Sequence, residues 1–304
     1  MTNQKGNVVV TGGAGFIGSH LSSALLAEGY AVSVVDNLSG GKREKVPERA
    51  TFHEMDVNDT KLLTEVMKSV KYVFHLAALP RVQYSIEHPV ETNQANVNGT
   101  VSVLTAARDA GVARVIYSAS SSAYGDQAIM PLVEDMPANP KSPYGLQKYI
   151  GELYCRIFSE VYGLSTVSLR YFNVYGPGAS AEGAYALVIA KFLKQRTEGK
   201  PMTITGDGTQ TRDFTHVRDV VRANMLATTS DKVGKGEVVN IGAGNNVSVN
   251  RIAELIGGLV EHIAPRLEPH DTLADHARAK ELLGWEPSVS LEDGIAELKK
   301  EFGL

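Results

Sequence analysis

Three polar residues near the middle of the chain, Ser120, Tyr144 and Lys148, could together carry acid–base chemistry. Tyr144 and Lys148 are four residues apart, which places both side chains on one face of a helix. A free tyrosine has a pKa of about 10 and is a poor base at neutral pH, but a neighbouring ammonium stabilises its phenolate. The phenolate can then take a proton from a substrate hydroxyl that Ser120 holds by a hydrogen bond. Because this spacing alone is more typical of an exposed pair, the prediction depends on the surrounding elements.

A glycine-rich stretch at Val8–Leu21, VVVTGGAGFIGSHL, predicts a strand, a tight turn and a helix that could hold a dinucleotide. Glycines let the turn form and let a pyrophosphate approach the free N–H groups at the helix start. They can be grouped as Gly13-x-Gly15-x-x-Gly18 or as Gly12-x-x-Gly15-x-x-Gly18. The second spacing is typical of short-chain dehydrogenase-like proteins. A purely structural glycine turn is the alternative.

The next predicted strand, Ala31–Val35, ends in Asp36, where dinucleotide-binding folds place a carboxylate against the adenosine ribose. That carboxylate would repel a 2′-phosphate and favours NAD over NADP. Lys42 and Arg43 follow closely and weaken this preference, because a 2′-phosphate needs basic side chains. The positive charge of an oxidised nicotinamide would further stabilise the Tyr144 phenolate while hydride passes to the cofactor.

Predicted strands and helices alternate along the chain, which indicates an α/β fold with a doubly wound parallel sheet (Rossmann fold) and ligands at the carboxyl ends of its strands. Residues 1–175 are expected to form the NAD-binding domain, with parts of 210–245 returning to it, and residues 176–304 a smaller C-terminal α/β substrate lobe. Further strands are expected at Thr51–Met55, Tyr72–Leu76, Arg114–Ser118, Ser165–Leu169 and Val238–Ile241. Helices are expected at Thr60–Val70, Pro89–Ala110, Tyr144–Tyr162, Tyr185–Gln195 and Val249–Val260.

Composition narrows the class of protein. The 304 residues carry a formal net charge of −4 with dispersed basic residues, so neither nucleic acid nor a membrane is predicted as a partner. No apolar run is long enough to span a bilayer, and the chain reaches its first strand by Val8 without a signal segment. The single cysteine, Cys155, excludes an internal disulfide framework and is expected to be a buried packing residue. We therefore expect a cytoplasmic protein, with no metal site.

From Val8 to about Leu298, the chain resembles the extended short-chain dehydrogenase/reductases, specifically the nucleotide-sugar 4-epimerases related to UDP-galactose/UDP-glucose 4-epimerase. The shared motifs are TGGAGFIGSH, DNLSGG from Asp36, HLAA from His75, NVNGT from Asn96, SASSSAYG from Ser118, YGLQK from Tyr144, RYFNVYG from Arg170 and GDGTQTRDFTHVRD from Gly206. The chain is most similar to the branch that acts on UDP-N-acetylhexosamines, with which it shares SSSAYG, SPYGLQKY and GAYALVI. The resemblance implies an NAD-dependent isomerase that inverts C4 of a UDP-hexose through a transient 4-keto intermediate. It also implies a homodimer that pairs the helices at Pro89–Ala110 and Tyr144–Tyr162.

The resemblance further implies a role for individual residues. Cofactor contacts are implied for Gly12, Gly15, Phe16, Ile17, Gly18, Asp36, Asn37, Leu38, Ser39, Gly40, Gly41, Asp56, Val57, Leu76, Ala77, Ala78, Ala95, Ser118, Tyr144, Lys148 and Phe172. Substrate contacts are implied for Arg81, Ser120, Ser121, Tyr144, Asn173, Leu187, Val188, Thr203, Ile204, Thr205, Arg212, Arg266, His270 and Thr272. Within this set, Asn173 and Arg212 would hold the diphosphate, although a surface ion pair of Arg212 with Asp213 or Asp219 is the alternative.

Two departures from the family pattern affect substrate affinity more than the type of reaction. Family members usually carry two arginines in this stretch. Arg266 corresponds to the first if the alignment is shifted by one residue, and His270 occupies the position of the second. One contact to the diphosphate is therefore weakened or depends on pH. Pro80 and Arg81 replace the customary lysine after the strand that ends in HLAA.

Three other functions of related proteins make different demands on these residues. A 4,6-dehydratase or decarboxylase of the same superfamily needs acidic residues after the fifth strand, where this chain has Ser121 and Ser122. A non-catalytic NAD-sensing regulator would not need the pair Tyr144 and Lys148. A net sugar-nucleotide dehydrogenase that releases NADH would use the same three residues, so the sequence leaves it open.

Thr272 bears on which hexose fits. In the family, a bulky tyrosine at this position borders the sugar and excludes N-acetyl groups. The smaller Thr272 leaves room for an acetamide, to which Ser121 offers a hydrogen bond, whereas the long cation Arg81 could fill the same volume. We expect UDP-N-acetylglucosamine to be accepted, together with UDP-glucose and UDP-galactose.

Overall fold

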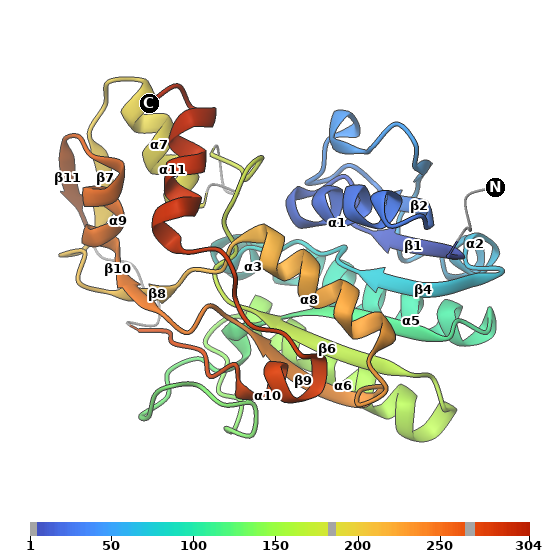
Figure 1. Cartoon of the computed structure of the whole chain (residues 1–304). Helices are drawn as coiled ribbons and strands as arrows, with labels where there is room; N and C mark the ends of the chain where they lie inside the picture. The colour runs from blue at the N-terminus through green and yellow to red at the C-terminus, as the bar shows by residue number, and fades with distance from the viewer. Residues whose placement is uncertain (1–4, 182–186, 265–270) are drawn as a thin grey trace.

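The computed structural model describes residues 5–181, 187–264 and 271–304, and a seven-stranded parallel sheet forms its larger part (Figure 1). The strand order is β3-β2-β1-β4-β5-β6-β9, and every neighbouring pair is parallel. The strands are β1 (Asn7–Thr11), β2 (Ala31–Asp36), β3 (Thr51–Glu54), β4 (Val70–His75), β5 (Arg114–Ser120), β6 (Thr166–Tyr171) and β9 (Lys235–Ile241). The expected doubly wound sheet is confirmed, and its order reverses between β1 and β4, where such folds bind their ligands.

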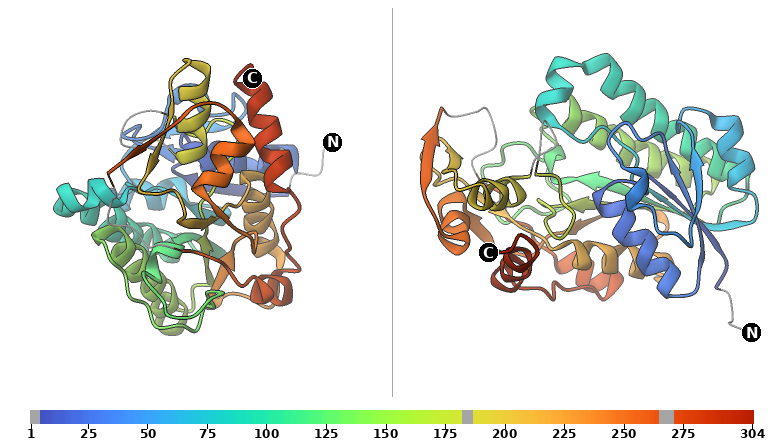
Figure 2. Two further views of the ribbon diagram at one scale, coloured as in Figure 1. Left: turned by 90° about the vertical axis from the view of Figure 1, so that its left-hand side faces the viewer. Right: turned by 90° about the horizontal axis from the view of Figure 1, so that it is seen from above.

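Helices cover both faces of this sheet and bury its strands on both sides, except for the edge strand β3, which has no fully buried residue. One face packs against α1 (Phe16–Ala27), α8 (Val217–Thr229) and α10 (Ala277–Leu283). The other face packs against α2 (Thr60–Val66), α5 (Gly99–Asp109) and α6 (Pro143–Tyr162). Figure 2 shows the resulting three layers from two further directions.

A smaller lobe lies beyond the carboxyl ends of the strands, at the left of Figure 1. It contains two short two-stranded sheets, one pairing β7 (Met202–Thr205) with β11 (Val260–Ile263) and one pairing β8 (Thr211–Asp213) with β10 (Asn246–Ser248). The helices α7 (Val188–Thr197), α9 (Val249–Ile256) and α11 (Leu291–Glu301) complete it. These helices and β7 share a hydrophobic core that includes Phe192, Ile204, Ile252 and Leu298.

The chain passes between the two lobes more than once after residue 176. Residues of α8, β9 and α10 belong to the core of the large sheet, and the fully buried Trp285 joins them there. The division of the chain into residues 1–175 and 176–304 stays a prediction.

Several elements differ from the expectations. The helix expected at Pro89–Ala110 consists of α4 (Pro89–Asn93), a π-helical turn at Gln94–Asn98 and α5. In that turn the Asn96 side chain accepts a hydrogen bond from Leu79 N at 2.7 Å and donates one to Leu79 O at 3.1 Å, so it is tied to the loop after β4. The helix expected at Val249–Val260 ends at Ile256, because Gly257 has a φ of +77° and leads into β11.

Four of the described α-helices were not expected, two of which are α10 and α11. The short α3 (Val82–Glu87) follows the loop after β4, and α8 follows β8. The inward face of α8 consists largely of valine and alanine, and a sequence rich in β-branched residues does not predict a helix strongly. Burial against β5 and β6 stabilises the helix in spite of this weak propensity.

Candidate active site

A large cavity of about 860 Å³ lies at the carboxyl ends of the strands and extends into the smaller lobe. Most of the site residues predicted from the sequence line it. These are Gly12, Gly15, Phe16, Ile17, Gly18, Asp36, Asn37, Ser39, Gly40, Gly41, Asp56, Val57, Leu76, Ala77, Ala78, Arg81, Ala95, Ser118, Ser120, Ser121, Tyr144, Lys148, Asn173, Leu187, Arg212 and Thr272.

The glycine turn between β1 and α1 has the shape of a phosphate cradle. Gly12 has a φ of +73°, and a Cβ atom at Gly18 would lie 2.2 Å from the Gly12 carbonyl oxygen, so neither position tolerates a side chain. Gly15 is the N-cap of α1, whose free N–H groups begin at the cavity wall. Gly13 instead faces Val34 and does not belong to the lining. The geometry therefore favours the spacing Gly12-x-x-Gly15-x-x-Gly18.

Asp36 stands at the end of β2 beside this turn. Its carboxylate accepts hydrogen bonds from Ala14 N at 3.0 Å and Leu38 N at 2.8 Å, so the acidic group is held in place. Burial raises the pKa of Asp36 above its usual value, and these two hydrogen bonds oppose that shift. Lys42 and Arg43 do not line the cavity; Lys42 lies 3.9 Å from Glu44, and Arg43 stacks on the ring of Phe52. This end of the cavity presents a carboxylate and no adjacent basic pair.

The carboxyl end of β5 and the first turns of α6 bring Ser120, Tyr144 and Lys148 together, away from the glycine turn. β5 ends in Ser120, and α6 begins after Ser142, whose Oγ accepts a hydrogen bond from Gly145 N at 3.1 Å. Glycines let α6 lie close to β5, because a Cβ atom at Gly151 would lie 2.2 Å from the Tyr117 hydroxyl. The helix therefore brings Tyr144 within hydrogen-bond reach of Ser120.

Burial shifts the pKa values of Tyr144 and Lys148 in opposite directions. It raises the pKa of Tyr144 above 10, while the hydrogen bond with Ser120 and the charge of Arg81 act in the opposite direction. Burial lowers the pKa of Lys148 to about 8, and the nearby Cys155 and Glu152 oppose this shift. The Lys148 ammonium donates a hydrogen bond to Ser118 O at 2.8 Å. Lys148 is therefore a cation at neutral pH, and a lowered pKa of Tyr144 stays a prediction that requires a bound cofactor.

A buried ion pair stands behind Lys148 on the same face of α6. The Arg170 guanidinium donates to both oxygens of Glu152, at 2.8 and 2.7 Å, and both side chains are at most 4% exposed. Glu152 lies one helical turn beyond Lys148, so its negative charge acts on the lysine. Sequence reasoning missed this pair, although the spacing Tyr144, Lys148, Glu152 was visible as a continued helical face.

At the far end of the cavity, Asn173, Arg212 and Thr272 come from three distant parts of the chain. Asn173 Nδ2 donates to Asp213 O at 3.1 Å and to Thr272 Oγ1 at 3.3 Å. Asp213 and Asp219, the alternative partners considered for Arg212, each accept several other hydrogen bonds. The cavity wall at this end thus combines a guanidinium, an amide and a hydroxyl.

Some predicted site residues lie elsewhere. Phe172 is fully buried against Tyr124, Leu132 and Ala274, and Ile204 is buried in the core of the smaller lobe. The cavity lining also excludes Leu38, Val188, Thr203 and Thr205. Arg266 and His270 lie outside the described residues.

The lining includes residues that were not predicted. Lys45 Nζ donates to Gly178 O at 2.8 Å, which ties the loop after β2 to the chain that enters the smaller lobe. Val82, Gln83 and Ile86 line the cavity from α3. Their spacing on one helical face was a signal, but the helix itself is too short to be recognised from periodicity.

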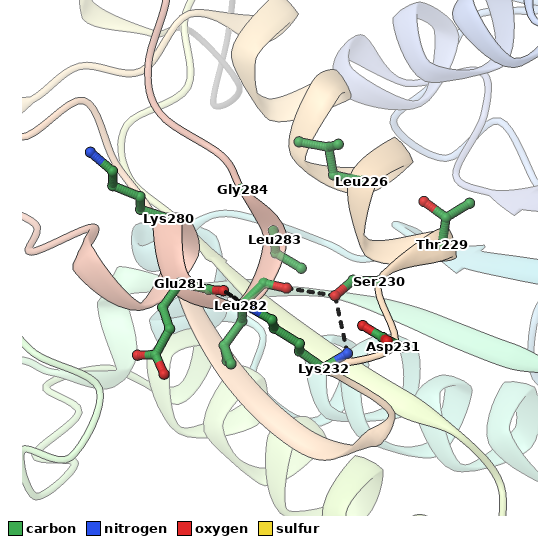
Figure 3. Close-up of a pocket in the computed structure, with 10 residues that line it drawn as sticks. All are labelled: Leu226, Thr229, Ser230, Asp231, Lys232, Lys280, Glu281, Leu282, Leu283 and Gly284. Carbon is green, nitrogen blue, oxygen red and sulfur yellow. Dashed lines mark hydrogen bonds between the residues drawn. The ribbon is translucent and has the colours of Figure 1, made fainter.

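A second hollow of about 280 Å³ lies between the ends of α8 and α10 (Figure 3). The Ser230 hydroxyl donates to Leu282 O, and Lys232 Nζ donates to Glu281 O at 2.9 Å. Side chains that follow α8 are thus hydrogen-bonded to the main chain of α10, and none of the predicted site residues lines this hollow.

Three further observations concern the predictions from composition. Cys155 is fully buried, and burial raises the pKa of its thiol to about 12, which confirms a packing role. No helix among the described residues is long and apolar enough to cross a membrane. Across residues 5–181, 187–264 and 271–304, no three histidine, cysteine or acidic side chains are grouped as metal ligands would be.

Comparison with known proteins places these features in a family. A family model described as the NAD dependent epimerase/dehydratase family matches residues 8–242. A putative UDP-glucose 4-epimerase of Methanocaldococcus jannaschii is 38% identical over 95% of each chain. Among solved structures, UDP-glucose 4-epimerase of Thermotoga maritima with UDP-glucose is 39% identical, with a TM-score of 0.93 over 98% of both chains. UDP-N-acetylglucosamine 4-epimerase of Methanobrevibacter ruminantium, in complex with UDP-N-acetylmuramic acid, is 37% identical, with a TM-score of 0.93 over 98% of both chains. The resemblance seen in the motifs is thereby confirmed, and the chain belongs to the NAD dependent epimerase/dehydratase family.

Proposed function

We propose that this chain is an isomerase, an NAD-dependent epimerase that inverts C4 of a UDP-hexose through a transient 4-keto sugar. One observation carries the proposal: a single cavity joins the glycine turn at one end to Ser120, Tyr144 and Lys148 at the other. The relatives named above include a UDP-glucose and a UDP-N-acetylglucosamine 4-epimerase, which supports a UDP-sugar as the substrate.

NAD would lie along the carboxyl ends of β1, β2, β4 and β5. The side-chain-free surface at Gly12 and Gly18 suits a pyrophosphate, and the Asp36 carboxylate suits ribose hydroxyls. Leu76–Ala78 and Ala95 would contact the cofactor largely through their backbone. When bound, NAD supplies a hydride acceptor that can return the hydride to the sugar.

Tyr144 and Ser120 would manage the proton of the sugar's C4 hydroxyl. The Ser120 hydroxyl lies within hydrogen-bond reach of Tyr144, so both groups can contact one substrate oxygen. Tyr144 would take the proton at its phenolic oxygen when the ketone forms and return it when the alcohol is restored. Lys148 would keep a positive charge beside the phenolate and hold the nicotinamide ribose.

The UDP group would occupy the end of the cavity that the smaller lobe forms. Arg212 and Asn173 offer a cation and an amide to the diphosphate, and Leu187 an apolar wall to the uridine. Val188, Thr203–Thr205, Arg266 and His270 remain part of this proposal on the family resemblance alone.

Thr272 and Ser121 would set the choice of hexose. Thr272 Oγ1 accepts hydrogen bonds from Asn173 Nδ2 and Asp213 N, both at 3.3 Å, so this small side chain is fixed at the cavity wall. We propose that UDP-N-acetylglucosamine is accepted and that UDP-glucose and UDP-galactose are also converted.

The carboxylates that line the cavity argue against a dehydratase. Among the described lining residues they are Asp36, Asp56 and Asp126. Asp36 and Asp56 lie at the end of the cavity that the glycine turn lines, and Asp126 pairs with Lys141 at 3.8 Å. No described carboxylate is available beside Ser121 and Ser122 to remove a C5 proton.

Product analysis by NMR tests the proposal directly. The purified protein is incubated with UDP-glucose or UDP-N-acetylglucosamine without added NAD, and formation of the C4 epimer is expected because the hydride returns to the sugar. Steady accumulation of NADH in proportion to product would instead establish a net dehydrogenase.

A cytoplasmic homodimer completes the proposal. The outer surface of α6 exposes Leu146, Ile157, Val161 and Tyr162, each at least 41% exposed, which suits pairing with a second copy. The free, buried Cys155 fits a reducing compartment. Sedimentation of the purified protein at twice the monomer mass would support the dimer.

A further inference from the structure

Asp213 is a fully buried carboxylate next to Arg212, at the end of β8 and outside the cavity lining. It accepts hydrogen bonds from three main-chain N–H groups: Ala243 N at 2.8 Å, Gly244 N at 3.0 Å and Ala274 N at 2.9 Å. These groups belong to the turn after β9 and to the segment that carries Thr272. One side chain therefore fastens three stretches that are far apart in the sequence.

The main chain of Asp213 extends the same cluster toward the cavity. Its carbonyl oxygen accepts from Asn173 Nδ2 at 3.1 Å, and its N–H donates to Thr272 Oγ1 at 3.3 Å. The packing is tight, because a Cβ atom at Gly242 would lie 2.3 Å from Ala274 Cβ. Figure 1 shows β8 and β10 in the part of the smaller lobe that faces the large sheet. Arg212 of β8 lines the cavity, so a displacement of this strand would move the cavity wall.

We propose that Asp213 is a positioning residue for the substrate, whose ionised carboxylate holds Arg212, Asn173 and Thr272 in the arrangement that binds a nucleoside diphosphate sugar. The proposal rests on the function proposed above, because it assigns those three residues to the UDP-sugar. An amide in place of the carboxylate would offer only one acceptor oxygen to three N–H donors and would direct its own N–H groups at them. The three cavity groups would then lose their common anchor.

The direction of the pH dependence follows from the surroundings of Asp213. Burial raises its pKa to about 6, which the three N–H donors and His276 oppose. As pH falls through about 6, the carboxyl group takes up a proton, its hydrogen bonds to the N–H groups weaken, and substrate affinity is lost. Among the described residues, His276 is the titratable group that faces the Asp213 carboxylate, and Arg212 is its charged neighbour on β8.

The test compares Asp213→Asn with Asp219→Asn. Asp219 is also buried and also fastens distant segments, since it accepts from Ser288 N and Val289 N, but it lies outside the cavity lining. In the NAD-loaded protein, Asp213→Asn should raise the KM for UDP-glucose by about tenfold or more, because displaced binding groups lose their alignment. Its kcat should stay within a few fold, and Asp219→Asn should lower thermal stability without raising KM. An unchanged KM in folded Asp213→Asn overturns the proposal.

A second measurement avoids the risk that Asp213→Asn does not fold. Tyr144→Phe keeps Asp213 and should bind UDP-glucose with turnover slowed by about 10²–10⁴-fold, and calorimetry can follow the Kd from pH 7.5 to 5. The diphosphate of UDP-glucose does not titrate in that range. Binding that weakens below about pH 6, with NAD retained, supports the proposal. Binding that is constant or stronger at low pH overturns it, whereas absence of binding at every pH together with absence of epimer from the wild type overturns the proposed function itself.

Discussion

Replacement of Glu152 by glutamine removes the negative charge behind Lys148 and breaks the most deeply buried ion pair that the structure records. The Arg170 guanidinium would keep its charge with one oxygen partner in place of a bidentate carboxylate. Removing one partner of a buried pair costs about 3–5 kcal/mol, because the remaining charge stays buried without compensation. Since glutamine keeps one acceptor oxygen, we expect a loss of free energy of unfolding near the lower limit, about 3 kcal/mol.

The same substitution should change the pH profile of turnover. Burial lowers the pKa of Lys148 to about 8, and Glu152 is one of the two groups that oppose this. Glu152 is an opposite charge one helical turn from Lys148, so its removal should lower the pKa of Lys148 below its present value of about 8. The ammonium form exists below that pKa. Activity that depends on it should therefore decline at lower pH in the variant than in the wild type.

Urea denaturation and the pH dependence of kcat measure these two effects separately. With a slope of about 1–3 kcal/mol per molar urea, the expected loss moves the midpoint by about 1–3 M. Glu198→Gln is a matched control, because Glu198 is exposed and pairs with Lys194 and Lys200 on the surface; a much smaller change is expected there. If Glu152→Gln has the urea midpoint of the wild type and its kcat declines at the same alkaline pH, the ion pair does not act on Lys148 as proposed.

Three further substitutions address the remaining parts of the site. Tyr144→Phe should lower kcat by about 10²–10⁴-fold with an unchanged melting temperature, and near wild-type turnover would exclude Tyr144 as the acid–base group. Gly18→Ala places a Cβ atom 2.2 Å from the Gly12 carbonyl oxygen, so the purified protein should have lost its NAD; full retention would contradict the proposed cradle. Thr272→Tyr should abolish turnover of UDP-N-acetylglucosamine and spare UDP-glucose, and an equal loss on both would show that Thr272 does not set the choice.

The cofactor end of the site could be predicted from residue types and spacing because it is local in sequence. The glycine turn and Asp36 lie within thirty residues and are read from one strand–turn–helix unit followed by the next strand. The pair Tyr144 and Lys148 is likewise fixed by one helix. Short-range rules of backbone geometry decide such positions, so the structure places all of them on one cavity.

The substrate end could not be derived in this way. Asn173, Arg212 and Thr272 meet through hydrogen bonds between segments about 40 to 100 residues apart, and no local rule brings them together. The family resemblance supplied them. Phe172 was assigned to the cofactor on the same resemblance; its side chain packs against Tyr124 and Ala274 outside the cavity lining, and the assignment stays a prediction. The π-helical turn at Gln94–Asn98 was missed for a similar reason, because a tertiary contact of Asn96 accompanies it.

Buried carboxylates connect the fold to the chemistry at each end of the cavity. Asp36 is fixed by Ala14 N and Leu38 N, Glu152 by Arg170, and Asp213 by three N–H groups of the smaller lobe and its junction. Burial raises the pKa of all three, which means that the folded protein holds each negative charge at a cost to stability near neutral pH. Burial also disfavours the charged form of Asp219. Five hydrogen bonds to its carboxylate nevertheless leave its pKa lowered, and it lies away from the cavity. A raised pKa is not confined to the cavity, because burial also raises that of Glu134, and Asp56 lines the cavity with a lowered pKa. Asp36 lines the cavity, and Glu152 and Asp213 lie close to lining residues, which is the placement expected of charges kept for binding and catalysis.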